Sequence, residues 1–260
     1  MNIADARRPN EIIYLDQPEK VSMADSWFDY GTANHFWVRH RNAVLDRNFG
    51  KALRRADQVG EIGCGSGLIL NYIAQRYGKA VDGFELNLHA LQQCPPLPGQ
   101  LHIYNIFSRH PSFIEKYDLL MLMDVIEHIE DEVEFLITVG QHLRPNGHVL
   151  IGVPMRQHLY SAYDKADGHY RRYSQERLKS ITLASGFEIE QFIQWGHAYL
   201  PLLLLRKFML KNVSGDDAIR QGFSISPAAN VLLSGLRLLD IFPTFGWTGA
   251  SGMLMARKSE

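Results

Sequence analysis

Three glycines at alternate positions follow a short apolar stretch near residue 60 of this 260-residue chain. Residues 58–62 read Gln-Val-Gly-Glu-Ile, and Gly63, Gly65 and Gly67 follow with one residue between each pair. An apolar helical pattern begins at Leu68, so the segment predicts a buried strand, a tight turn and a helix N-terminus. Such a turn offers free N–H groups to a ligand at a place where a Cβ would collide. The G-x-G-x-G spacing differs from the G-x-G-x-x-G of dinucleotide folds, and no P-loop Gly-Lys-Ser/Thr follows.

Carboxylates stand next to the predicted strand ends on either side of this turn. Glu61 precedes the first glycine, and Glu85 ends a second predicted strand over 80–86. An acid about 20 residues beyond a glycine turn can accept hydrogen bonds from two ribose hydroxyls. Glu85 therefore predicts a cofactor that carries a ribose, without identifying that cofactor.

A further strand is predicted over 117–123, where the sequence is almost uninterruptedly apolar. Its end carries Asp124, Val125, Glu127 and His128. Central parallel strands have this pattern, and ligands bind at their carboxyl ends in open α/β sheets. A lone histidine after a strand is more often structural than catalytic, so the position of His128 alone does not assign it a role.

Together these segments resemble the class I S-adenosylmethionine (SAM) dependent methyltransferases. Glu-Ile-Gly-Cys-Gly-Ser-Gly at 61–67 is similar to the first motif of that family, and Asp-Val-Ile-Glu-His at 124–128 is similar to its strand-four motif. Gly-His-Tyr-Arg-Arg-Tyr at 168–173 resembles a segment of a large small-molecule subgroup. The resemblance covers residues 58–193 and 250–258. It implies SAM as cofactor and S-adenosylhomocysteine as product.

The resemblance also implies site residues. The implied cofactor contacts are Glu61, Gly63, Cys64, Gly65, Gly67, Glu85, Leu86, Asn105, Ile106, Asp124 and Val125. Asn105 departs from the acid that the family often has there, although an amide oxygen can also accept from an exocyclic amine. His128 and His169 are the candidate catalytic bases for an oxygen acceptor.

Substrate contacts are expected from Tyr30, Trp37, Tyr160 and Arg171, which belong to two segments rich in aromatic and polar groups. The aromatic residues before the first strand are equally well explained by packing. Arg171 or Arg172 can hold a carboxylate or phosphate, or can brace the loop by pairing with Asp164 or Asp167; for one of them we expect the bracing role. No metal is expected, although Asp124, Glu127 and His128 include donors that a divalent cation accepts.

The expected fold is α/β, with a doubly wound, mostly parallel sheet of seven strands in the order 3-2-1-4-5-7-6. The resemblance implies that the last strand, over 251–257, is antiparallel. Residues 1–57 are expected to form an N-terminal helical cap, 58–193 with 250–260 the SAM-binding domain, and 194–249 a helical insertion. Within the insertion, 200–205 is apolar and precedes Arg206 and Lys207. This stretch is too short to span a membrane, so the insertion is expected to serve as ordinary packing, a lid, a homodimer surface or a peripheral membrane contact through 198–242.

The composition excludes some classes of protein. The formal net charge is −1, which gives no nucleic-acid footprint. Two cysteines cannot build a disulfide framework, and the N-terminus lacks the apolar region of a secretory signal. We expect a cytoplasmic protein that can also lie at the inner face of a membrane.

The predicted function is SAM-dependent methyl transfer by in-line displacement to a small-molecule, glycan or lipid-like acceptor, at oxygen. Two alternatives remain open at this point. One is an NAD(P)-dependent oxidoreductase, which shares the pattern of strand, glycine turn and acid. The other is a non-catalytic SAM-binding partner protein.

Overall fold

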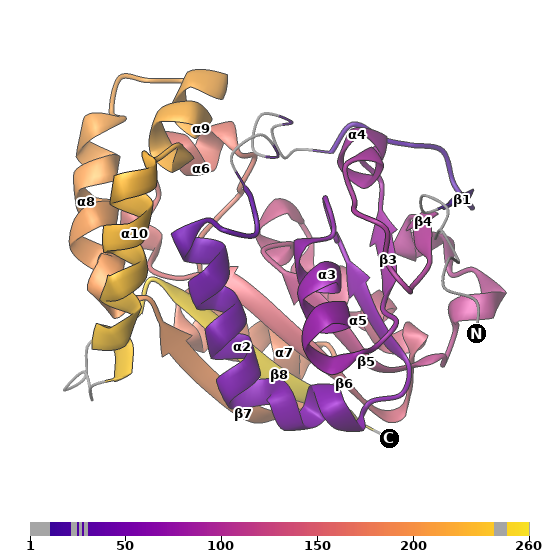
Figure 1. Cartoon of the computed structure of the whole chain (residues 1–260). Helices are drawn as coiled ribbons and strands as arrows, with labels where there is room; N and C mark the ends of the chain where they lie inside the picture. The colour runs from indigo at the N-terminus through magenta and orange to yellow at the C-terminus, as the bar shows by residue number, and fades with distance from the viewer. Residues whose placement is uncertain (1–10, 22–24, 26–27, 29–30, 242–248, 260) are drawn as a thin grey trace.

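The structure of the chain is a computed structural model that describes residues 11–21, 25, 28, 31–241 and 249–259. Within these residues one sheet carries helices on both faces, and a further group of helices lies at one end of its strands (Figure 1). The strands are β1 (Ile12–Tyr14), β2 (Val59–Ile62), β3 (Asp82–Glu85), β4 (Leu101–Ile103), β5 (Tyr117–Met123), β6 (Leu143–Pro154), β7 (Phe187–Trp195) and β8 (Ser251–Lys258).

The sheet has eight strands in the order β1-β4-β3-β2-β5-β6-β8-β7. All pairs from β1 to β6 are parallel, and β8 is antiparallel to both β6 and β7. The seven expected strands therefore occur in the expected order, with the last one antiparallel. The carboxyl ends of β2, β3, β5, β6 and β7 all face the same edge, which is where a ligand site is expected.

The helices connect these strands. They are α2 (Phe36–Arg55), α3 (Leu68–Tyr77), α4 (Leu88–Gln92), α5 (Glu132–His142), α6 (Ala162–Ala166), α7 (Gln175–Ala184), α8 (Leu200–Met209), α9 (Asp216–Phe223) and α10 (Pro227–Leu236). Short 3-10 turns are η1 (Ile106–Ser108), η2 (Pro111–Phe113), η3 (Ile126–His128), η4 (Gln157–Leu159), η5 (His197–Tyr199) and η6 (Arg237–Ile241).

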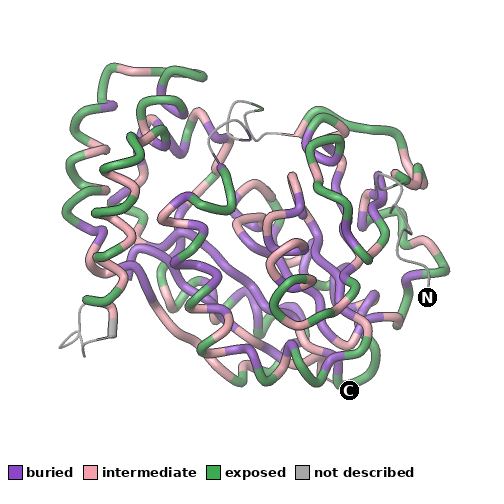
Figure 2. Tube along the Cα trace, in the orientation of Figure 1, coloured by how far each residue is buried: buried purple, intermediate pink, exposed green. Residues whose placement is uncertain are grey.

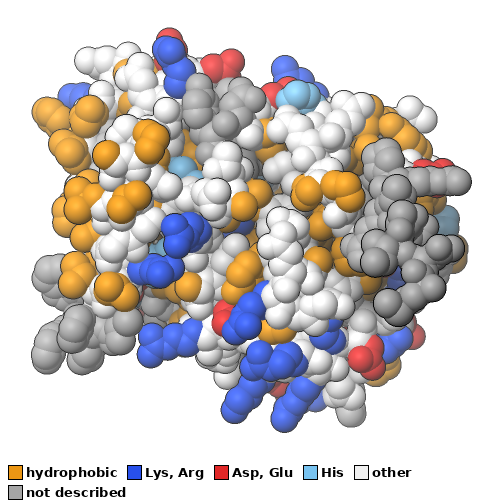
Figure 3. Space-filling view, in the orientation of Figure 1, with side chains coloured by type: hydrophobic (Ala, Val, Ile, Leu, Met, Phe, Trp, Pro, Cys, Tyr) orange, Lys and Arg blue, Asp and Glu red, His pale blue; other side chains and the backbone are white. Residues whose placement is uncertain are grey.

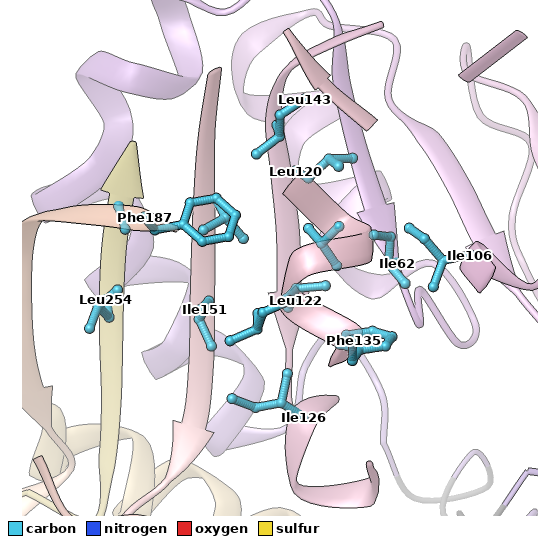
Figure 4. Close-up of a cluster of buried hydrophobic side chains, with 14 of the residues drawn as sticks. Ile62, Ile106, Leu120, Leu122, Ile126, Phe135, Leu143, Ile151, Phe187 and Leu254 are labelled. Atoms are coloured by element: carbon cyan, nitrogen blue, oxygen red, sulfur yellow. The ribbon is translucent and has the colours of Figure 1, made fainter. Parts of the chain in front are cut away.

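Two apolar layers hold the sheet between helices. On one face, residues of α2 and α3 such as Leu45 and Ile73 are fully buried against the strands. On the other face, Phe135 of α5 lies near Leu122 and Ile151 of the central strands (Figure 4). Burial of each such side chain stabilises the fold by roughly 1.5–3 kcal/mol. Figure 2 shows the resulting distribution, with the central strands buried and the outer helices exposed on one side.

The N-terminal region adds a strand that the sequence did not predict. β1 pairs parallel with β4 at the edge of the sheet, so residues 1–57 are not only a helical cap. A strand of three residues is too short to show an alternating pattern, and an edge strand is half exposed. The following N–H groups of Leu15 and Asp16 donate to the carbonyl oxygen of Ile103 and continue the edge.

The described residues that follow β1 lie at the carboxyl ends of the strands and beside the glycine loop, which we define as residues 63–67. The Glu19 N–H donates to the Leu86 carbonyl at 3.0 Å, and Asn87 Nδ2 donates to Asp25 Oδ1 at 2.8 Å. Phe28, in turn, is buried against the glycine loop. This segment therefore covers the part of the edge between β4 and β2.

The described part of the insertion between β7 and β8 consists of α8, α9 and α10 with the turns η5 and η6, joined by short loops. It packs on α6 through its own small apolar cluster, which contains Tyr163, Leu210, Ile219 and Phe223. Among the described residues, no helix is both long and apolar enough to cross a bilayer. Because β7 ends at the carboxyl edge of the sheet, the insertion starts beside the expected ligand site.

Candidate active site

A cavity of about 670 Å³ lies at the carboxyl edge of the sheet, between the glycine loop and the insertion. The glycine-loop side of its lining includes Glu61, Gly63, Cys64, Gly65 and Ser66. Its polar centre includes Arg41, Asp124, Glu127, His128, Asp167, His169 and Arg172. The insertion contributes Leu202, Leu203, Leu205, Arg206, Met209, Leu210, Phe223 and Leu233, so one end of the cavity is polar and the other is mostly apolar.

Two positions of the glycine loop require glycine, both because their φ angles are positive and because neighbouring side chains leave no room for a Cβ. Gly65 has φ +53°, and a Cβ there would lie 3.2 Å from Phe28 Cε1. At Gly63, with φ +69°, a Cβ would lie 2.7 Å from Val125 Cγ2. A side chain at either position would combine an unfavourable φ with a collision. The loop is thereby held close to the strand end that carries Asp124.

The carboxylate of Glu85 ties the end of β3 to this loop. Its Oε2 accepts from the Gly65 N–H at 2.9 Å, and its Oε1 accepts from the N–H groups of Leu86 and Asn87 at 2.8 and 2.9 Å. Burial nevertheless raises the pKa of Glu85 above its usual value. A carboxylate has about four acceptor positions, so these three bonds leave one for a further donor.

Glu61 presents a buried carboxyl group to the cavity. Its Oε2 has no hydrogen-bond partner among the described residues. Burial raises the pKa of Glu61 to about 8, although the nearby Arg41 opposes this shift. Arg41 donates instead to Asp124 Oδ2 at 2.9 Å. A buried acid without a partner is costly in isolation and suits a cationic ligand group.

Asp124 and Glu127 lie at the end of β5. Asp124 has φ +60°, an uncommon conformation that Asp tolerates better than most residues and that recurs at functional sites. Glu127 is fully buried, and neither carboxyl oxygen has a hydrogen-bond partner among the described side chains and backbone groups. Burial and, next, the charge of Asp124 raise the pKa of Glu127 to about 8.

The two candidate histidines carry different charges. His169 lies between two acids, with Nδ1 3.3 Å from Asp164 Oδ1 and Nε2 3.3 Å from Asp167 Oδ2. Burial alone would lower the pKa of His169, but these two acids raise it to about 10. The His128 ring meets it edge to face at 4.7 Å, and burial together with the His169 charge lowers the pKa of His128 to about 4. At neutral pH His169 is therefore a cation and His128 is neutral.

Asp164 is the buried anchor of this arrangement. Its Oδ1 accepts from Arg172 Nε at 2.7 Å, and its Oδ2 accepts from the Ser161 N–H and hydroxyl at 2.8 and 2.9 Å. Although burial opposes ionisation, His169 and Arg172 hold the pKa of Asp164 well below its usual value. Of the two arginines, Arg172 thus has the bracing role expected for one of them.

Ligand atoms of Glu127, His128 and His169 all lie within 4.8 Å of one another, which is compact enough for a divalent cation. Both ring nitrogens of His169 face carboxylates, however, and a protonated imidazole offers no lone pair to a metal. Within the described part of the chain, this group fits a cation poorly unless His169 loses its proton. The expectation that no metal takes part stays a prediction.

A family model described as a methyltransferase domain matches residues 34–192 of the chain, which include the glycine loop and all the polar residues at the centre of the cavity. The chain belongs to this methyltransferase-domain family. The resemblance to class I SAM-dependent methyltransferases is thereby confirmed, and the alternatives of an oxidoreductase and of a non-catalytic partner are set aside.

Relatives of this methyltransferase include ubiquinone biosynthesis O-methyltransferases. That of Photorhabdus laumondii is 26% identical over 167 residues, which cover 57% of this chain and 65% of the relative. That of Proteus mirabilis is 27% identical over 142 residues, which cover 49% of this chain and 55% of the relative. The chain thus matches somewhat more than half the length of each of these curated relatives.

Solved structures support the fold. Phosphoethanolamine N-methyltransferase 2 of Haemonchus contortus, in complex with SAM, matches with a TM-score of 0.59 and 19% identity over 91% of this chain and 58% of that chain. A putative sarcosine dimethylglycine methyltransferase of Galdieria sulphuraria matches with a TM-score of 0.55 and 14% identity over 85% of this chain and 86% of that chain. At these sequence identities the similarity is evidence for a shared fold.

The structure brings most of the predicted site residues of this methyltransferase to the cavity. Those that line it are Glu61, Gly63, Cys64, Gly65, Asp124, His128, His169 and Trp37. Gly67 caps α3, and Glu85, Leu86 and Val125 lie immediately behind the lining. Tyr30 lies outside the described residues.

Four predicted contacts lie elsewhere. The Asn105 side chain caps η1 by accepting from the Phe107 N–H at 3.1 Å, and Ile106 is buried in the core. The Tyr160 hydroxyl donates to the His169 carbonyl at 2.6 Å. Arg171 pairs with a glutamate of α5 and donates to two backbone carbonyls. Asn105, Tyr160 and Arg171 thus already have local partners, and the cavity lining does not include them.

Several cavity residues escaped the sequence analysis. Arg41 sits inside a helical pattern that gives no sign of a site, and Arg206 interrupts an apolar stretch that was interpreted as packing or a membrane contact. Asp167, which lines the cavity, and Asp164, which contacts His169 without lining the cavity, were named only as partners of the arginines. The one available signal was the number of charged groups in 164–172, which is high for an ordinary loop.

We predict that His169 stays protonated and His128 stays neutral from pH 5.5 to 9, because their pKa values lie near 10 and 4. Ring ¹⁵N chemical shifts in a pH titration measure this directly. Asp167→Asn should lower the pKa of His169, whereas Asp217→Asn, at an exposed ion pair of α9, should not.

The raised pKa of His169 also predicts how the stability of the protein depends on pH. The pKa of His169 in the folded protein exceeds its value near 6.5 in the unfolded chain. Its contribution to the free energy of unfolding is therefore complete below pH 6.5 and is lost as the pH rises toward 10. In Asp167→Asn this loss should be smaller. A His169 ring that titrates below pH 8 in the unaltered protein would contradict the assignment.

Proposed function

We propose that this protein transfers a methyl group from SAM to a hydroxyl oxygen of a small, largely apolar acceptor. One observation carries the proposal: a single cavity joins the glycine loop to the Glu127–His128–His169 group and continues to an apolar wall. Cofactor, proton acceptor and methyl acceptor can therefore meet in one place. We also propose that 58–193 with 250–260 form the cofactor domain, and that the insertion serves as a lid over the acceptor.

The residues present fit SAM. Glu61 offers a buried carboxyl group without a partner to an ammonium or sulfonium group, and Glu85 retains an acceptor position for a ribose hydroxyl. Asp124 and the glycine loop lie on the same side of the cavity. When bound, SAM supplies an electrophilic methyl group, so the protein's main task is alignment of the acceptor.

Oxygen is proposed as the acceptor atom on two grounds. The two curated relatives described above are ubiquinone biosynthesis O-methyltransferases. In addition, the centre of the cavity holds groups able to take a proton, which an oxygen acceptor requires and an amine acceptor needs less. Since the chain matches only part of the length of those relatives, their acceptor is not carried over.

We propose His128 as the group that takes the proton and Glu127 as the group that makes it basic enough. His128 is neutral, but burial and His169 leave it a weak base. An ionised Glu127 at about 5 Å would favour the imidazolium of His128 by about 3 kcal/mol at an effective dielectric constant near 20. His169, already protonated, cannot accept a proton, so the proposal gives it a positioning role.

The outward face of the insertion is apolar. Phe208 and Met209 of α8 are 78% and 68% exposed, and Val231 and Leu232 of α10 are 76% and 72% exposed. Figure 3 shows hydrophobic side chains gathered over α8 and α10. With Lys211 directly after α8, we propose that this face contacts a lipid surface. A homodimer interface is the alternative.

For the cofactor we predict micromolar binding of S-adenosylhomocysteine and no binding of NADH by calorimetry. Gly65→Val should abolish this binding, because the branched side chain meets Phe28 at a positive φ. The matched control is Gly78→Val, which has φ +66° but open space around it and lies outside the cavity lining. Binding of NADH alone, or equal effects of the two substitutions, would refute the cofactor assignment.

For the proton transfer we predict that kcat/KM rises with pH up to an apparent pKa near 8, where Glu127 ionises. Production of S-adenosylhomocysteine from SAM and 4-dodecylcatechol, whose hydroxyl groups ionise well above the pKa of Glu127, gives the rate. Glu127→Gln should remove this pH dependence, and His128→Ala should lower kcat by about 100-fold without changing cofactor affinity. His158→Ala, at an exposed histidine, is the control. Unchanged turnover in His128→Ala would remove it from the mechanism.

To test the outward face, we predict that the protein cosediments with vesicles that contain phosphatidylglycerol. The double substitution Phe208→Asp and Val231→Asp should abolish it, whereas Leu183→Asp, at a 58% exposed position of α7, should not. Light scattering distinguishes the alternative. A dimer that dissociates in the double variant, with no vesicle binding by the unaltered protein, would assign the face to a second copy.

A further inference from the structure

Arg206 brings a positive charge to the cavity wall without a carboxylate of the described residues at ion-pair distance. It lines the cavity from α8, and its Nε has no hydrogen-bond partner among the described residues. No ion pair within the described chain involves it, although ion pairs are numerous around the cavity. An arginine cannot escape this situation by losing its proton, because its pKa stays far above neutrality even when burial lowers it.

The other arginines of the cavity are balanced. Arg41 pairs with Asp124 at 2.9 Å, and Arg172 pairs with Asp164 at 2.7 Å. Both pairs bridge separate segments of the chain and are explained by the stability of the site. Arg206 differs from them because its charge has no such explanation.

The contacts that Arg206 does make hold it in place without neutralising it. Its Cζ lies 4.1 Å from the centroid of the Tyr163 ring, and one NH1 group donates to the Gly222 carbonyl at 3.4 Å. A ring face and one long hydrogen bond replace only part of the solvation that a guanidinium loses on burial. Burial lowers the pKa of Arg206, and the charge of Arg172 adds to this shift, whereas Tyr163 and the more distant acids Asp164 and Asp167 oppose it without forming an ion pair with Arg206.

The wall around Arg206 is mostly apolar and continues to the molecular surface. Leu205 and Met209, which flank it on α8, line the cavity and are also 54% and 68% exposed. Leu210, one turn further along from Arg206, is buried beside Tyr163. A ligand in this part of the cavity would therefore meet the Arg206 cation beside the apolar side chains of α8, with Gln221 and Ser224 as further polar groups of the lining.

We propose that the methyl acceptor is an amphiphilic anion, whose carboxylate or phosphate group pairs with Arg206 and whose apolar portion lies against α8. The proposal rests on the proposed function, since it concerns the acceptor part of the same cavity. A planar guanidinium matches either anion with two parallel hydrogen bonds. The anionic group of the substrate thus supplies the ion-pair partner that Arg206 lacks among the described residues.

The test compares ligands that differ only in charge. Calorimetry on the protein saturated with S-adenosylhomocysteine measures the affinity for decanoate, decyl phosphate and 1-decanol, each below its aggregation limit. We expect at least one of the two anions to bind about ten- to a hundredfold more tightly than the alcohol. The two anions separate a carboxylate acceptor from a phosphate acceptor.

Arg206→Gln should reduce the affinity for the preferred anion to that of 1-decanol and leave 1-decanol itself unchanged. Arg206→Lys should keep part of the preference, and Arg220→Gln, at an exposed ion pair of α9, should keep all of it. Equal binding of anion and alcohol by the unaltered protein overturns the proposal, as does an undiminished preference in a folded Arg206→Gln. Failure of S-adenosylhomocysteine to bind at all would instead refute the proposed function.

Discussion

The buried carboxylate of Asp164 is the constraint on which the rest of the site depends. It has no exposure to solvent, so its charge is tolerable only because Ser161, Arg172 and His169 surround it. These partners come from the start of α6 and from the loop that follows it. By satisfying one carboxylate, the chain fixes the path of 161–172 along the cavity and brings the Tyr170 N–H to the Glu127 carbonyl at 2.8 Å.

The charges at the centre of the cavity follow from that anchor. Two acids hold His169 as a cation, and this cation helps to keep His128 neutral. Glu127 accepts no hydrogen bond from either histidine, and burial raises its pKa to about 8. Groups with pKa values pushed apart in one small space are typical of sites that move protons. The histidine that looked equally suited to be a base in the sequence is thereby confined to orientation and electrostatics.

The insertion supplies the apolar part of the cavity lining. The strand ends and the glycine loop provide polar groups of the cavity, whereas α8 and α10 provide hydrocarbon and the cation of Arg206. The same helices turn apolar side chains outward, so the apolar wall of the cavity and the apolar outer face belong to one structural unit (Figure 3). An acceptor that reaches the cavity along this unit would exchange one apolar environment for another.

The sequence by itself determined the features that depend on local pattern. The glycine loop, the acids Glu61 and Glu85, and the 124–128 segment could be predicted, because each combines a periodic apolar stretch with turn or cap chemistry a few residues away. The strand order was implied by the resemblance that these segments carry. The three-residue strand β1 was missed, since an edge strand of that length has no pattern to detect.

Only the tertiary structure decided how distant charges pair. Arg171 and Arg172 are neighbours in sequence, yet one pairs with an acid of α5 and the other with Asp164. Arg206 and Tyr163 are more than 40 residues apart and stack on each other. The sign and size of a pKa shift depend on burial and on charges within a few ångströms, and neither quantity is encoded in local spacing. For that reason the sequence placed the predicted cofactor residues near one sheet edge, whereas their protonation states, their partners and the contributions of Arg41 and Arg206 to the cavity came from the tertiary structure.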